Sequence, residues 1–386
     1  MTRLRHPSSF ATFIAFAALG VAQLQATTYT WLETGPNLNW LNGANYGGSG
    51  TIAPNNSDIF VFDVGTRNAT VNTNGEVGKV IVGPNFGNAT TAANISQSGN
   101  SVVSISSGGL PEGTTAGIEV LTGRTLETNF NARLNLSGDI TISNGSTARL
   151  RLGVGNGAGG LGGTGNLAIT SGVVLLPATT TAHSYSGAVT VNNGGTLQVN
   201  GDSVFTTYSS LSVGANGSLS GGGTFGAADV HSGGRISPGG EGGSSAGPGT
   251  LTFTNLLTLQ STGLAVIDIK PTGYDAINGT GGVALGGELR LRLDSAYTTE
   301  GTYQLFLGSL SGNFDSITIR TDGTASTAVN LTNDGDGLWS GEFASRGYQV
   351  AFDANTGALT LVNLVPEPSH FLLSAIGVLT LLRRRR

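Results

Sequence analysis

A short glycine-led motif recurs through the middle of the chain and limits the folds that this sequence can adopt. An apolar residue stands two positions after glycine in Gly195-Thr196-Leu197, Gly217-Ser218-Leu219, Gly234-Arg235-Ile236 and Gly249-Thr250-Leu251, and successive copies begin 22, 17 and 15 residues apart. Irregular spacings of roughly 20 residues are typical of solenoids, whose coils stack while their loops vary in length. A closed sandwich would have fewer and longer connections. The recurrence therefore predicts an elongated right-handed parallel β-helix.

Alternation of apolar and polar residues accompanies this motif. It is clearest in Ala188-Val189-Thr190-Val191 and in Glu288-Leu289-Arg290-Leu291-Arg292-Leu293. Because successive side chains of a strand point to opposite faces, one face of each strand is expected to be buried and the other to face water. The 63 glycines allow tight turns between such strands, and only 11% of the residues are charged. We therefore predict an all-β body.

The predicted body has three parts. Residues 27–66 form an N-terminal β cap, residues 67–263 a β-solenoid, and residues 264–364 a further β region. Glycine clusters within 202–250 indicate either a long loop or a run of thin coils.

The first 26 residues have the order of a secretory signal peptide. Arg3 and Arg5 precede an apolar stretch, and Ala26 supplies a small residue at the expected cleavage position. We therefore predict export, with cleavage near Ala26.

The C-terminal end, residues 365–386, combines three features in a fixed order. Pro366, Glu367 and Pro368 come first, a 12-residue apolar run from Phe371 to Leu382 follows, and the chain finishes with Arg383, Arg384, Arg385 and Arg386. A helix of this run would span about 18 Å, whereas the hydrocarbon core of a membrane is about 30 Å thick. Basic residues remain on the cytoplasmic side. The pattern predicts a short transmembrane helix that anchors the chain only marginally. A marginal anchor is suited to a segment that will be removed. The alternative is an ordinary tail anchor that stays in the membrane.

This tail resembles the PEP-CTERM sorting signal. The resemblance covers about 21 residues and implies recognition by an exosortase-type membrane peptidase, cleavage near Pro366, Glu367 and Pro368, and release at the cell surface or into the extracellular matrix. It also implies an association with exopolysaccharide or other matrix components. Membrane contact would then be transient, through the C-terminal helix in the inner membrane before processing.

The segment from residue 163 to 201 resembles the autotransporter-associated β-strand repeat. Tyr185, Ser186-Gly187 and Gly194-Gly195-Thr196-Leu197-Gln198-Val199 fall in that family's order. The resemblance implies a passenger-type β-helix. It does not imply a catalytic site. Residues 264–364 are similar to the C-terminal end of such passengers, which closes the helix.

Composition excludes several classes of site. The chain has no cysteine, so no disulfide, thiol nucleophile or thiolate metal site can form. Without the two terminal segments, 12 basic side chains face 22 acidic ones. Such a body has no surplus of cations to bind phosphates, so no nucleic-acid partner is predicted.

Candidate chemical groups are few and dispersed. His183 and His231 lie in Ser-, Gly- and Thr-rich surroundings and are expected to be exposed. Trp31, Trp40 and Tyr46 either cap the solenoid or form an aromatic sugar-binding platform. The candidate acids for a carbohydrate-active site are scattered along the chain: Asp139, Asp202, Asp229, Glu241, Asp268 and Asp275.

Two Asp-rich segments are similar to calcium loops. They are Asn333-Asp334-Gly335-Asp336-Gly337 and Asp353-Ala354-Asn355-Thr356-Gly357. Neither continues to the bidentate acid that such a loop needs, so both are predicted to be hairpin turns.

We therefore predict no catalytic residue, metal or cofactor. The preferred function is that of a non-catalytic exported surface or extracellular-matrix protein, structural or adhesive. The alternative is a carbohydrate-binding or polysaccharide-cleaving β-helix that uses the same export route.

Overall fold

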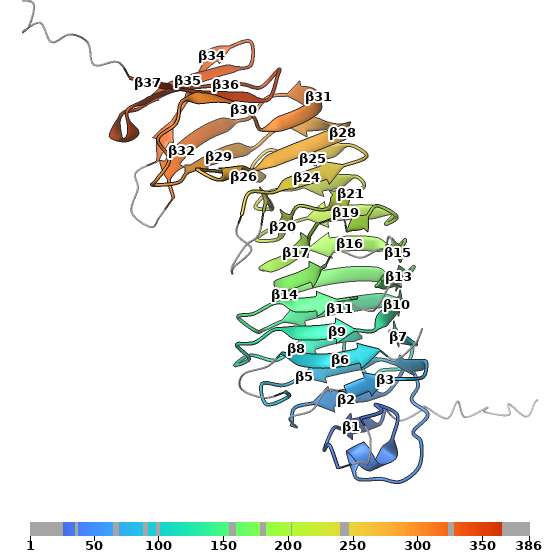
Figure 1. The fold of residues 1–386 in the computed structure, drawn as a ribbon. Coiled ribbons are helices and arrows are strands. Elements are labelled where there is room, and N and C mark those ends of the chain that lie inside the picture. The colour runs from blue at the N-terminus through green and yellow to red at the C-terminus, as the bar shows by residue number, and fades with distance from the viewer. Residues whose placement is uncertain are drawn as a thin grey trace, which may run out of the picture.

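The computed structural model describes residues 26–34, 38–64, 69–87, 92–97, 101–153, 160–177, 183–201, 203–239, 247–322 and 328–364. They form an elongated stack of coils with the N-terminal coil at one end and an antiparallel sheet at the other (Figure 1). Within these ranges the regular elements are strands, apart from two short 3-10 helices, η1 (Gly43–Tyr46) and η2 (Ala344–Arg346). The prediction of an all-β solenoid is confirmed.

Each coil passes through three faces. In the middle of the chain, β16 (Ala188–Val191), β17 (Gly195–Val199) and β18 (Val204–Phe205) lie on successive faces, and β19 (Ser210–Val213) returns to the first. β16 pairs with β19 in parallel and in continuous register. Backbone donors and acceptors are thereby satisfied by the coils before and after, as a solenoid requires.

The first face is a column of parallel strands that joins neighbouring coils. Besides β16 and β19 it contains β1 (Thr28–Thr30), β2 (Ile59–Phe62), β5 (Lys79–Val82), β8 (Gly117–Val120), β11 (Asp139–Asn144), the start of β14 (Asn166–Leu176), β22 (Ala228–Val230), β25 (Leu257–Leu259), and the ends of β28 (Ala276–Leu285) and β31 (Phe306–Gly312).

The second face is a similar column. Besides β17 and the end of β14 it contains β3 (Ala69–Val71), β6 (Ala93–Gln97), β9 (Thr128–Asn131), β12 (Leu150–Leu152), β20 (Ser218–Gly221), β23 (Arg235–Pro238), β26 (Leu264–Lys270), β29 (Glu288–Leu293) and β32 (Ser316–Thr321). Two short antiparallel strands border it, β27 (Gly273–Tyr274) and β33 (Val329–Asn330).

The third face has shorter strands. They are β4 (Gly75–Val77), β7 (Val102–Ser106), β10 (Arg133–Ser137), β13 (Leu161–Gly163) and β15 (Ser184–Tyr185), followed in later coils by β18, β21 (Thr224–Phe225), β24 (Thr250–Phe253) and the start of β28 and of β31.

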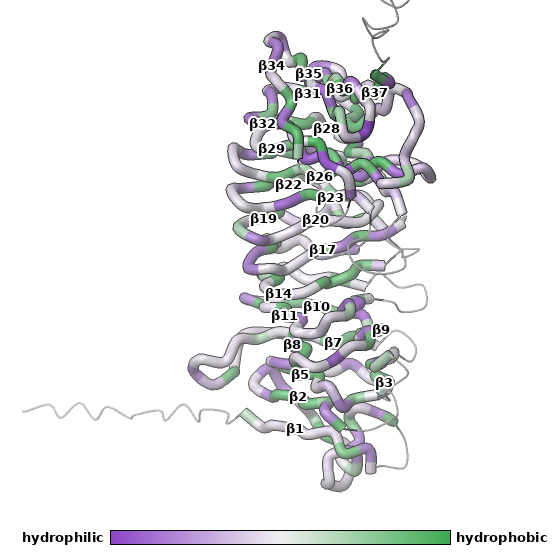
Figure 2. The backbone as a smooth tube through the Cα atoms, turned by 90° about the vertical axis from the view of Figure 1, so that its left-hand side faces the viewer, coloured by the Kyte–Doolittle hydropathy of each residue, from purple (hydrophilic) through white to green (hydrophobic). Residues whose placement is uncertain are grey.

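Inward side chains stack in rows along the axis. Leu197, Leu219 and Ile236 occupy equivalent positions in successive coils of the second face. On the third face Phe225 stacks on Phe253, with ring centroids 5.5 Å apart. All of these side chains are buried. Apolar and polar segments alternate over the whole length of the tube (Figure 2), and the buried apolar side chains form one cluster that extends from Trp31 to Leu361.

The structure explains the glycine of the recurring motif. A Cβ atom at Gly195, Gly217 or Gly234 would lie 2.4, 2.1 or 2.3 Å from a carbonyl oxygen of the preceding coil. Real Cβ contacts are not this short, so only glycine lets the turn approach its neighbour. Gly249 is different, because Leu251 lies in β24 on the third face and pairs with Ile277. The fourth copy therefore does not continue the row of the first three.

The parallel stack continues beyond residue 263. β26, β29 and β32 pair in full register, and the coils end at Thr321. A five-stranded antiparallel sheet lies at this end, in the order β30 (Gly301–Gln304), β37 (Ala358–Asn363), β36 (Tyr348–Asp353), β35 (Leu338–Phe343) and β34 (Thr332–Gly335); β30 precedes the last coil in the chain and the other four strands follow it. Phe352 of this sheet packs against Phe306 and Phe314 and so covers the apolar interior of the last coil. Between residues 202 and 250 the described residues contain the strands β18 to β23 and the first residue of β24, which belong to successive coils.

Candidate functional site

The residues predicted to direct export lie mostly outside the described part of the chain. The C-terminal residues that the structure does not describe include Pro366, Glu367, Pro368, Arg383, Arg384, Arg385 and Arg386, and of the predicted signal peptide, residues 1–26, only Ala26 is described. Among the described residues there is no helix with the length and apolar character to cross a membrane. Signal-peptide cleavage and tail processing remain predictions.

The N-terminal aromatic residues are buried rather than displayed. Trp31 and Trp40 are both 0% exposed. The Trp31 ring lies 5.5 Å from those of Tyr46 and Phe62, and the Tyr46 hydroxyl donates a 2.7 Å hydrogen bond to the carbonyl oxygen of Trp40. Sugar rings stack on exposed aromatic faces, so the interpretation of these residues as a sugar-binding platform is wrong. They fill the interior of the first coil.

His183 is also buried, contrary to the prediction from its polar surroundings, whereas His231 is exposed as predicted. The Nδ1 atom of His183 accepts a hydrogen bond from the Leu161 amide at 3.2 Å, and its Nε2 atom lies 3.1 Å from the Ser203 hydroxyl. Because Nδ1 accepts, the neutral ring carries its proton on Nε2 and donates it to Ser203.

This arrangement is structural. A general base must accept the proton of its serine, and here the imidazole donates to the hydroxyl instead. Ser203 is itself fully buried, so no substrate reaches it in this conformation. Burial lowers the pKa of His183 to about 4, which keeps the ring neutral at ordinary pH. The pair joins the third-face strands of neighbouring coils.

The structure brings together two acids that lie seven positions apart in the sequence. Asp275 is 1% exposed; its carboxylate accepts hydrogen bonds from the amides of Gly249 at 2.9 Å and Asp268 at 3.1 Å. Burial raises the pKa of Asp275 to about 7, although these two hydrogen bonds oppose the rise. Asp268 forms a bidentate ion pair with Arg292.

These contacts give the two acids structural roles. Asp275 fixes the start of β24 against β26, and Asp268 is neutralised by the neighbouring strand. Of the other candidate acids, Asp139 and Asp229 are exposed on the first face, and Asp202 and Glu241 lie outside the described residues. Within the described ranges no group of three or more potential metal-ligating side chains occurs.

The two calcium-like segments are hairpin turns, as predicted. The first joins β34 to β35 and the second joins β36 to β37. Asp353 accepts hydrogen bonds from the Asn355 amide and the Thr356 hydroxyl, both at 2.9 Å. Slight burial raises the pKa of Asp353, but its hydrogen bonds outweigh this effect and hold the pKa below its ordinary value. The carboxylate is thus occupied by its own turn.

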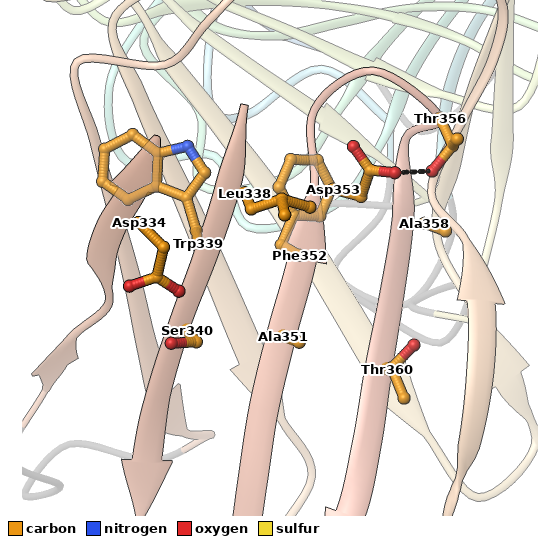
Figure 3. Close-up of a pocket in the computed structure, with 10 residues that line it drawn as sticks. All are labelled: Asp334, Leu338, Trp339, Ser340, Ala351, Phe352, Asp353, Thr356, Ala358 and Thr360. Atoms are coloured by element: carbon orange, nitrogen blue, oxygen red, sulfur yellow. Dashed lines mark hydrogen bonds between the residues drawn. The ribbon is translucent and has the colours of Figure 1, made fainter. Parts of the chain in front are cut away.

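A shallow cleft of about 300 Å³ lies beside these turns on the antiparallel sheet (Figure 3). Ser340, Ala351 and Thr360 form a row of small side chains across β35, β36 and β37. Leu338, 48% exposed, and Asp353 border it. The Trp339 indole donates to Asn313 at 2.8 Å and is 5% exposed, so its ring is held by the body. The cleft offers hydroxyl groups and two carboxylates, those of Asp334 and Asp353, and the Asp353 carboxylate is engaged by its own turn.

Searches of protein-family models, of curated proteins and of solved structures found no match to this chain. The resemblances drawn from the sequence therefore remain proposals.

Proposed function

We propose that this chain is a non-catalytic, exported protein of the cell surface or extracellular matrix, with a structural or adhesive role. One observation carries the proposal. The described coils place continuous apolar rows inside and short polar side chains such as Thr190, Ser212 and Thr258 outside, which makes a long rod with repeated outward surfaces. Such a rod is long and presents an extended surface for contacts with other molecules, which suits a structural or adhesive matrix protein. A right-handed winding is part of this proposal, because parallel β connections are right-handed in nearly all proteins.

The delivery route is proposed from the two ends of the sequence. The signal peptide would direct export, and the PEP-CTERM-like tail would hold the chain in the inner membrane until an exosortase-type peptidase cuts near Pro366, Glu367 and Pro368. The terminal arginines would oppose transfer of the tail across the bilayer.

Mass spectrometry of the extracellular fraction of the native host tests this route. We expect the exported protein to lack Phe371 to Arg386, and a variant with alanine at positions 366, 367 and 368 to stay in the membrane fraction. A control variant with alanine at Ser369 and His370 keeps the Pro-Glu-Pro motif and should be released. Exported protein that still contains Arg386 would refute removal of the tail and favour a plain anchor.

A further inference from the structure

A pocket of about 340 Å³ lies at the corner between the first and second faces, near the N-terminal end of the rod. Its walls come from the turns that follow β5 and β8, two strands that pair in parallel in neighbouring coils (Figure 1). The first turn contributes Pro84 and Asn85, and the second contributes Arg124, Thr125 and Leu126. The volume is at the small end of the range for ligand sites, so the pocket suits a molecule about the size of a single sugar.

Arg124 is buried in the wall of this pocket without a carboxylate partner. It is 4% exposed. Its Nε atom donates to the Thr128 hydroxyl at 2.9 Å, its Nη1 atom to the carbonyl oxygen of Phe86 at 2.5 Å, and its Nη2 atom to that of Glu127 at 3.1 Å. Within the described ranges no carboxylate forms an ion pair with it. Burial accordingly lowers the pKa of Arg124, because its charge has been removed from water.

The donor count leaves this guanidinium able to bind an anion. A guanidinium has five N–H groups, one on Nε and two on each terminal nitrogen. The three hydrogen bonds use the Nε–H group and one N–H group on each terminal nitrogen, so one remains on Nη1 and one on Nη2. Two such groups on adjacent nitrogens can bind the two oxygens of one carboxylate. The existing bonds join Arg124 to both turns and so hold the group in place.

The acids nearest to this pocket are engaged elsewhere. The Glu127 carboxylate pairs with Arg149 at 2.6 Å and with Arg151 at 3.5 Å, both in the next coil. Asp63 of the preceding coil accepts hydrogen bonds from the backbone amide and the side chain of Asn85, each at 3.4 Å. These two carboxylates therefore do not neutralise the buried guanidinium by direct contact.

The charges around the corner leave one positive charge when every described partner is counted. On the first face Lys79 pairs with Glu119 at 2.6 Å, and these two charges cancel. The three arginines at positions 124, 149 and 151 then stand against the two acids at positions 63 and 127. A ligand with a single negative charge would balance the corner.

From this geometry we infer that the pocket binds a small sugar acid through its carboxylate. A phosphate group carries nearly two negative charges and would meet too few cations here. An amino acid is disfavoured because no residue that lines the pocket is acidic and could pair with its ammonium group. Asn85 and Thr125 are exposed and offer an amide and a hydroxyl to sugar hydroxyls, while Pro84 and Leu126 offer apolar surface. The rod would keep its proposed matrix role with or without this ligand, so the site goes beyond that role.

Isothermal titration calorimetry of the purified full-length chain tests this site, with glucuronate, a short oligogalacturonate, glucose and inorganic phosphate as ligands. We expect binding of a sugar carboxylate and not of glucose or phosphate. The tighter of the two acidic ligands identifies the source as a free sugar acid or as a residue of a polymer. Arg124→Gln should weaken binding by about tenfold or more, since hydrogen bonds to a charged group contribute on this order.

Arg124 also joins two coils, so a second variant leaves it in place. Thr125→Glu puts a carboxylate at an exposed position of the pocket and should weaken binding about threefold, as an exposed charge pair does. Thr122→Glu adds the same charge at an exposed position of the same turn outside the pocket and should bind like the parent. Circular dichroism checks that each variant is folded.

Three results would overturn the inference. They are equal binding of glucose or phosphate, equal affinities of Thr125→Glu and Thr122→Glu, and a folded parent chain that binds neither acidic ligand. The proposed matrix role would survive each of them, because it is tested by export and processing of the chain in the native host.

Discussion

Replacement of Phe225 by alanine tests whether the coils are held by stacked interior rows. Phe225 is 0% exposed and pairs in register with Phe205 and Phe253 of the neighbouring coils. Truncating a buried phenylalanine costs about 3–5 kcal/mol. Because parallel pairing holds Phe205 and Phe253 in place on either side of the cavity, we expect a loss of about 4 kcal/mol, within that range.

A solenoid is stabilised by contacts between neighbouring coils, so the loss of stability in Phe225→Ala should change the shape of the unfolding curve. We expect Phe225→Ala to separate the urea unfolding curve, followed by far-UV circular dichroism, into two transitions as the halves on either side uncouple. Thr224→Ala on the outward side of the same strand is the control and should change stability by less than about 0.5 kcal/mol. If the two variants behave alike, Phe225 does not contribute to a stacked row and the reasoning fails.

Two further predictions concern the buried acid and the Asp-rich turns. The pKa of Asp275 is about 7 in the folded chain against an ordinary 3.8, so the folded state binds more protons between these values and the free energy of unfolding should fall as pH rises through that window. Asp275→Asn should flatten this part of a melting-temperature profile, and an unchanged profile would contradict the assignment. Chelation of divalent cations should change the melting temperature by no more than a few degrees, because Asp353 is satisfied by its own turn; a large decrease would reveal a structural ion.

The sequence alone determined the strand content and the solenoid. Alternation in segments such as residues 288–293 indicates which side chains face inward, because the period of a strand is two residues and one face must leave water. The motif glycines at 195, 217 and 234 marked equivalent points of successive coils, since each lies against a carbonyl of the coil before it. The alternation within a strand is local and the motif glycine recurs with each coil, so both can be recognised from the spacing of residues in the sequence.

Only the tertiary structure decided which residues meet across coils. The polar neighbours of His183 predicted exposure, yet Leu161 and Ser203 of adjacent coils bury it and satisfy both ring nitrogens. Trp31 and Trp40 had two interpretations, and packing in the first coil chose between them. Loop lengths vary from coil to coil, so the sequence spacing could not predict that Asp268, Arg292 and Arg320 lie side by side in neighbouring strands. Register between distant strands is set by the packing of whole coils, so the residues that lie side by side in neighbouring coils are known only from that register.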